Sequence, residues 1–349
     1  MSNSTGNSGN FLSAILDFLL GLLGISQTPL TPPQPQPPAV PPDNTTEPVR
    51  IVTSHVLLVI YDPVMDPATG TKLSQFMNWN RPDDLANSFI QDILVASGGN
   101  ARFQIAQRVE LNEFPAKTDG YRYNAQTFAA VIKGTQSAYQ PEMADYMAIV
   151  TGLNILPQIT RREIDEVWLI GFPNAGFYES TMGGAGAFWC NAPPLTATAS
   201  CDRKFVIMGF SYERGVGEML HSFGHRCESI MTQAFAKTQG EANLYARFSR
   251  YDKTSPGQAE LGTIHFPPNA QQDYDYNNPT KVASNCYDWY NFPQFKNDVR
   301  QVNADEWGNG NLEILHSWWT KHLPKVAGRT SGVANNWWQY IMDPNLVNL

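Results

Sequence analysis

The order of hydrophobic and polar positions predicts strands that alternate with helices. Continuous apolar runs, which are typical of strands buried on both faces, occur at 50–62, 164–172 and 203–210. A further strand is expected at 101–111, and helical periodicity occurs at 81–97, 123–134 and 142–153. This alternation favours an α/β sheet layer. It is followed from about residue 262 by a loop-rich, aromatic C-terminal lobe with one or two helices, such as 311–323.

The longest predicted helix runs from about Tyr212 to Lys237, directly after a strand at 204–210. At about 100° per residue, six apolar positions fall on one stripe: Val216, Leu220, Phe223, Cys227, Ile230 and Ala234. Four polar positions fall on the opposite side, within a sector of about 80°: Glu218, His221, His225 and Glu228. We therefore expect one continuous helix whose apolar stripe, including Cys227, packs on the core.

His221 and His225 are four residues apart, so both imidazoles can bind one metal ion. Glu218 and Glu228 lie three residues outside this pair and are candidates for a third ligand, or for orienting an imidazole. The alternative is the solvated polar side of an ordinary helix. Gly217 and Gly224 flank the same face and indicate that another segment approaches closely there, because glycine lowers helix stability.

The segment "LHSFGHR" resembles the helix of zincin metallopeptidases, whose motif is HExxH. The order of elements is also similar: strand, helix, strand, a strand ending in the glycine-rich loop of "FYESTMGGAGAFWCN", an edge strand "FVIMGF", and the histidine helix. The resemblance implies a zincin-like mixed sheet, a zinc cofactor held by His221 and His225, and peptide hydrolysis. Ser222 stands where the motif has its general base, which implies weak hydrolysis unless Glu218 or Glu228 takes that role.

A third metal ligand is expected from downstream of the helix, as in zincins. His265, next to Pro267-Pro268, ranks with Glu228 above Glu218 and Glu241 as a candidate. The alternative for His265 is a buried imidazole bonded to backbone. The segment containing Asp273 and Asp275 resembles the start of a calcium loop. It lacks the glycine and glutamate of an EF-hand, so an ordinary turn is the other interpretation.

Composition narrows the classes of function. The chain has 349 residues, a formal net charge of −8 and no run of basic residues, which excludes a typical nucleic-acid binder. Few charges and many aromatic residues favour a secreted or cell-surface protein, and strings across 165–345 resemble a group of bacterial, often secreted proteins of unassigned function. Two further functions stay open. One is a glycan-binding or glycan-processing protein that uses Trp318-Trp319 and Trp337-Trp338, and the other is a non-catalytic binding or structural protein with a lost active site.

Three regions follow from composition. Residues 1–27 form an apolar tail that we expect to dock on a membrane, a partner protein or a carrier shell, and the alternative is a tail that folds against the body. Residues 28–48 form a proline-rich linker, and residues 49–349 a single α/β domain. The tail lacks the pattern of a conventional signal peptide, so export by another route and a cytoplasmic location are the alternatives to a conventionally secreted or cell-surface protein. The short loop between Cys190 and Cys201 predicts a disulfide, with four free thiols as the alternative.

Overall fold

The computed structural model describes residues 40–347, so the predicted tail and most of the predicted linker lie outside the described residues. The strands are β1 (Val52–Tyr61), β2 (Val64–Asp66), β3 (Thr71–Lys72), β4 (Ala101–Leu111), β5 (Glu166–Gly171), β6 (Ser180–Gly183), β7 (Phe205–Ser211), β8 (Val282–Ser284), β9 (Arg300–Val302), β10 (Lys325–Thr330) and β11 (Val333–Asn336). The α-helices are α2 (Leu73–Phe76), α3 (Pro82–Ala96), α4 (Ala125–Ile132), α5 (Tyr146–Gly152), α6 (Ile155–Thr160), α7 (Val216–Ala234), α8 (Leu244–Phe248), α9 (Leu312–Lys321) and α10 (Trp338–Met342).

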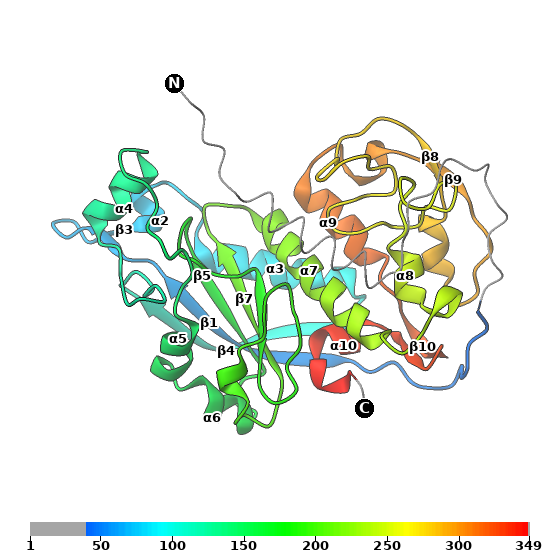
Figure 1. Ribbon diagram of the computed structural model, residues 1–349, viewed down its shortest axis with the longest axis horizontal. Coiled ribbons are helices and arrows are strands. Elements are labelled where there is room, and N and C mark those ends of the chain that lie inside the picture. The colour runs from blue at the N-terminus through cyan, green and yellow to red at the C-terminus, as the bar shows by residue number, and fades with distance from the viewer. Residues whose placement is uncertain (1–39, 348–349) are drawn as a thin grey trace.

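Five strands form a mixed sheet in the order β4-β1-β5-β7-β6, in which β6 runs antiparallel and the others are parallel (Figure 1). This confirms the predicted α/β sheet and its main strands. The expectation that "FVIMGF" forms the sheet edge is wrong, because β7 lies between β5 and β6. The physical reason is visible in the strands themselves: β7 is apolar on both faces and buried, whereas β6 has only four residues, which suits an edge.

Helix α7 begins and ends inside the predicted range of 212–237. The chain first continues β7 to Ser211, and the backbone N–H of Tyr212 donates to the carbonyl of Gly171, so the helix begins only after Gly215. Its apolar stripe packs on the core as predicted. The ring of Phe223 packs edge-on against Phe89 of α3, at a centroid distance of 5.7 Å, and Cys227 is fully buried.

A buried ion pair also holds α7 on the sheet. The guanidinium of Arg226 donates to both carboxylate oxygens of Glu166 on β5, at 2.8 and 2.9 Å. The same carboxylate accepts from the Ser54 hydroxyl and the Trp168 indole, so its oxygens are well satisfied. Breaking such a pair from one side typically costs about 3–5 kcal/mol, because a charge is left buried and unpaired. The position of α7 relative to the sheet is therefore strongly determined.

The C-terminal lobe covers the other side of α7, which runs between the sheet and the lobe in Figure 1. Gly217 makes this approach possible, because a Cβ there would lie 2.6 Å from the backbone nitrogen of Glu313 in α9. As a result His221 and Glu228 are only 5% and 6% exposed. The alternative of a solvated polar helix face is wrong for these residues, and the close approach inferred at the glycines is confirmed.

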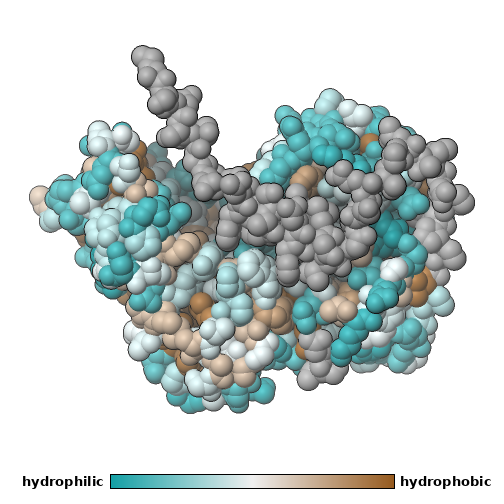
Figure 2. Space-filling model, viewed as in Figure 1, coloured by the Kyte–Doolittle hydropathy of each residue, from teal (hydrophilic) through white to brown (hydrophobic). Residues whose placement is uncertain are grey.

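The aromatic residues of the lobe form its core. Four tryptophans that were candidates for a glycan-stacking surface are all buried: Trp318, Trp319, Trp337 and Trp338. The visible surface of the lobe in Figure 2 is largely hydrophilic. These tryptophans therefore provide packing rather than an exposed platform for sugars.

The folded body begins earlier than the predicted linker boundary at residue 48. The backbone N–H of Asp43 donates to the carbonyl of Arg329 on β10, and the Arg329 guanidinium pairs with Glu47 at 2.8 and 2.9 Å. Cys190 and Cys201 are buried as free thiols in the structure, so the disulfide between them stays a prediction. Within residues 40–347, no helix combines the length and apolar character needed to cross a membrane.

Candidate metal centre

Two imidazoles of the centre come from α7. His221 and His225 lie one helical turn apart, so both side chains leave the helix on the same side. Their ring centroids are 4.7 Å apart. His221 is buried and His225 is partly buried, which places both rings below the protein surface.

The third imidazole, His265, comes from the loop after α8. The loop turns sharply at Gly262, whose φ is +76° and whose added Cβ would lie 1.9 Å from the carbonyl oxygen of Phe266. Only glycine fits such a position. The side chain of Ile264 packs against Gly224 of α7, where a Cβ would lie 2.3 Å from the Ile264 Cδ1 atom. The absence of a side chain at Gly224 therefore lets the loop bring His265 to the two helix histidines.

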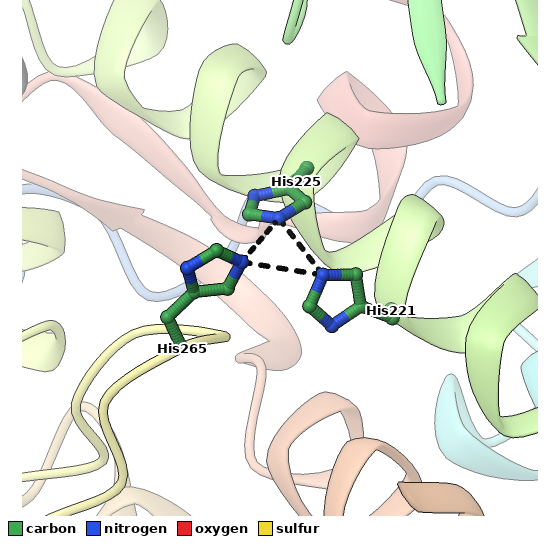
Figure 3. Close-up of side chains that lie close together, drawn as sticks. All are labelled: His221, His225 and His265. Carbon is green, nitrogen blue, oxygen red and sulfur yellow. Dashed lines mark hydrogen bonds between the residues drawn. The ribbon is translucent and has the colours of Figure 1, made fainter. Parts of the chain in front are cut away.

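The three Nε2 atoms point toward a common centre, as Figure 3 shows. The Nε2 atom of His225 is 3.1 Å from that of His221 and 3.0 Å from that of His265, and the remaining pair is 3.3 Å apart. Nitrogen atoms bound to one tetrahedral zinc ion at its usual bond length lie about 3.3 Å apart. Among the described His, Cys, Asp and Glu residues, these three form the group with metal-ligand spacing.

The opposite ring nitrogens of His225 and His265 face carboxylates. The Nδ1 atom of His225 is 2.8 Å from the Glu228 carboxylate, and the Nδ1 atom of His265 is 2.9 Å from the Asp273 carboxylate. A carboxylate only accepts, so each Nδ1 carries the hydrogen. In a neutral imidazole the Nε2 atom is then a lone-pair acceptor, which is the form that binds a metal.

The same reasoning fixes the tautomer of His221 through His316 of α9. The Nδ1 atom of His316 lies 2.9 Å from the carbonyl oxygen of Gly217 and must donate to it. In neutral His316 the Nε2 atom is therefore an acceptor, and it lies 3.3 Å from the Nδ1 atom of His221, which donates. The three Nε2 lone pairs thus converge, and a bound cation or a proton would relieve their repulsion.

Electrostatics at the centre favours one positive charge. Burial keeps the pKa of His221 far below its ordinary value and lowers the pKa of His316 to about 4, so both rings are neutral at pH 7. Burial also opposes a charge on His225, but the carboxylates of Glu179 and Glu228 outweigh it and raise the pKa of that ring. The pKa of Glu228 is lowered despite its burial, because it bonds to His225. These are the conditions that suit a metal cation.

Glu179 lies next to the centre, one residue before β6. Its carboxylate oxygens are 3.7 Å from the Nε2 atom of His225 and 4.0 Å from that of His221. Asn191 donates its side-chain N–H to the same carboxylate at 2.5 Å. Beside Glu179 runs a cleft of about 510 Å³, whose walls include Gly176, Phe177 and Ser222. Glu179 therefore adjoins both the three histidines and a cleft with space for a substrate.

Of the residues predicted from the sequence for the site, the structure brings some together and places others apart from them. His221, His225 and His265 come together. Glu228 is engaged by His225 on one oxygen and by the Ile264 N–H on the other, so it orients an imidazole and does not face the metal position, contrary to its prediction as a ligand. The predicted Glu218 pairs with Arg214 at 3.2 Å.

Two other candidates lie away from the centre. The carboxylate of Glu241 pairs with Arg250 at 2.5 Å. Asp275 accepts from the backbone N–H of Gln271 and from the Asn278 side chain, as in an ordinary turn, so nothing in its contacts supports a calcium site.

Sequence reasoning missed Glu179, Asn191 and His316, and it assigned Asp273 to a different kind of site. His316 carried a weak signal, because histidine is rare in this chain and this one falls in a predicted helix. Glu179 carried another, as the one acidic residue in the strand-and-loop segment "FYESTMGGAGAFWCN". Neither signal indicates proximity to α7. No protein-family model matches the chain, and no curated protein sequence is detectably similar to it.

Proposed function

We propose that the protein is a zinc-dependent hydrolase whose metal ligands are His221, His225 and His265. The observation that carries this proposal is the convergence of three Nε2 atoms within 3.0 to 3.3 Å of one another, with a partner on each opposite ring nitrogen. Three imidazoles are a preferred zinc ligand set that keeps a fourth position for water or substrate. Zinc at this position would supply a Lewis acid that activates water at neutral pH.

Peptide bonds are the substrate that we favour. The support is the resemblance of the histidine helix to that of zincin metallopeptidases, together with a mixed sheet placed next to it. The cleft beside the centre offers room for an extended chain, with Gly176 and Phe177 in its wall. The glycan alternative has lost its supporting feature, because the paired tryptophans are buried.

Metal binding is tested first, without any substrate. The purified chain is stripped with a chelator, reloaded with zinc and assayed by elemental analysis and competition with a chromogenic chelator. We expect one zinc ion per chain and its loss in His225→Ala. The matched control is His55→Ala, because His55 lies on β1 and pairs with Asp165, away from the centre. Equal zinc binding in both variants, or none in the wild type, would refute the metal centre.

Hydrolysis is then tested with a quenched-fluorescence peptide library and with labelled casein. We expect cleavage that depends on reloaded zinc and disappears in His225→Ala. A protein that binds zinc but cleaves neither probe would support the non-catalytic alternative. In that case the centre would be retained while the reaction is lost.

A further inference from the structure

We propose that Glu179 is the general base that the helix motif lacks. This inference rests on the proposed zinc hydrolase and names the residue that takes the proton from the attacking water. The motif position is occupied by Ser222, whose hydroxyl donates to the carbonyl oxygen of Glu218 one turn earlier. A hydroxyl has no affinity for a proton at neutral pH, so the base must come from another element.

The position of Glu179 suits this role. Its carboxylate approaches the Nε2 atoms of His225 and His221 to 3.7 and 4.0 Å, from the side of the cleft. The side chain is 43% exposed, so it meets both the cleft and the centre. Among the described acidic residues of the cleft wall, Glu179 is the one whose carboxylate lies within 4.0 Å of the Nε2 atoms of His221 and His225.

The distances favour a base over a fourth ligand. A fourth tetrahedral ligand would lie about 3.3 Å from all three nitrogens. Glu179 is farther than this from two of them, and it does not join the histidines as a group with metal-ligand spacing. The Glu179 carboxylate therefore lies beside the fourth ligand position, where it would take a proton from a bound water.

The carboxylate is held in place from the side of α7. The Asn191 amide donates to Glu179 Oε2 at 2.5 Å, and the backbone N–H of Asn191 donates to the Ser229 hydroxyl on α7 at 3.0 Å. The base and the metal-binding helix are thus linked through one residue. A supporting hydrogen bond of this kind holds a catalytic carboxylate at a fixed distance from the metal position.

The other carboxylates near the centre are already committed. Glu228 and Asp273 contact the Nδ1 atoms of His225 and His265, on the opposite side of each ring from the converging Nε2 atoms. Glu218 lines the cleft but forms an ion pair with Arg214 at 3.2 Å. With these carboxylates excluded as the base, Glu179 remains, which is the residue that the distances also favour.

The proposed step balances without another reactant. The water oxygen forms a bond to the carbonyl carbon of the substrate while one water proton moves to the Glu179 carboxylate. The carbon–nitrogen bond then breaks, and Glu179 returns the proton to the leaving nitrogen. The products are a carboxylic acid and an amine, and Glu179 ends as it began.

The test compares Glu179→Gln with Glu163→Gln, whose exposed carboxylate pairs with Arg161 and serves as the control for loss of one charge. Three quantities are measured on the zinc- or cobalt-loaded proteins: zinc affinity, binding of acetohydroxamate from the visible spectrum of cobalt, and cleavage of the fluorescent peptides. For Glu179→Gln we expect zinc affinity within about threefold of wild type, because three imidazoles still bind the metal. We expect a loss of peptide cleavage of at least about 100-fold.

Acetohydroxamate gives a readout that needs no substrate. On binding a metal it passes its hydroxyl proton to a neighbouring base, so we expect at least about tenfold weaker binding to Glu179→Gln and no change in Glu163→Gln. Adding Ser222→Glu to Glu179→Gln should restore part of both signals, because it returns a carboxylate to the motif position.

The outcomes separate this inference from the proposed function. If the wild type binds no zinc, the proposed function fails. If the wild type binds zinc and Glu179→Gln keeps wild-type acetohydroxamate binding, Glu179 is not the base. A loss of zinc affinity of about 100-fold or more in Glu179→Gln would also overturn the inference, because Glu179 would then be a metal ligand.

Discussion

Gly224→Ala tests whether the glycine of α7 is what allows His265 to reach the metal position. In an ordinary helix interior this change stabilises the fold by about 0.5–1 kcal/mol. Here the new Cβ would lie 2.3 Å from Ile264 Cδ1 and 2.5 Å from Ile264 Cγ1, while ordinary contact begins at 3.4 Å. Ile264 is only 2% exposed, so it has little space into which to retreat.

The size of the effect follows from these distances. The shortfall is 3.4 minus 2.3 Å, or about 1.1 Å, and overpacking of this kind typically costs about 1–3 kcal/mol. After subtraction of the helix gain, we expect a net loss of about 0–2.5 kcal/mol in the free energy of unfolding. His265 is the residue next to Ile264, and metal bonds tolerate displacements of only about 0.2 Å. We therefore expect zinc affinity to fall by about 100-fold or more.

The assay is competition with a chromogenic zinc chelator, combined with urea unfolding of the metal-free protein. The matched control is Gly152→Ala at the end of α5, where an added Cβ meets no atom within 4 Å. This control should keep the wild-type zinc affinity. The double variant Gly224→Ala with Ile264→Ala should recover affinity, because the clashing atoms are gone. Wild-type zinc affinity in Gly224→Ala alone would refute the reasoning.

Three further predictions concern other residues. Glu228→Gln should weaken zinc binding by about 10–100-fold, measured by the same chelator competition. The control Glu260→Gln alters a buried carboxylate of the lobe and should change stability but not zinc affinity. Burial lowers the pKa of His322 from 6.5 to about 3, so only the unfolded chain gains its proton below pH 6.5. Stability should then fall by about 1.4 kcal/mol per pH unit from this residue as the pH drops from 6.5 towards 3, and His322→Gln should show a shallower dependence in urea unfolding. Cys190 and Cys201 should not react with a thiol reagent in the native protein, because both are buried. The number of thiols in the denatured, unreduced chain then separates the two alternatives: four if all cysteines are free, and two if the predicted disulfide is present.

The sequence by itself determined the elements and one pair of ligands. Buried strands and amphipathic helices have apolar periodicities that depend on local backbone geometry, so β1, β4, β5, β7 and α3 were predictable from the chain. His221 and His225 are on one helix, and their separation of four residues is enough to place both rings on one side. His265 could be predicted only as a candidate, because a proline-containing loop indicates rigidity but not direction.

The tertiary structure decided the remaining parts of the centre. His316 is 95 residues from His221 along the chain, and it meets that ring only because α9 packs across α7. Glu179 reaches the same place because β6 lies at the sheet edge beside β7, a strand order that local patterns do not contain. Glu228 shares the polar side of the helix with both histidines. Its carboxylate nevertheless contacts the Nδ1 atom of His225 and the Ile264 N–H, on the far side of that imidazole from the metal position. Periodicity shows which side of an element a residue occupies, whereas the residues that face it depend on packing between elements distant in sequence.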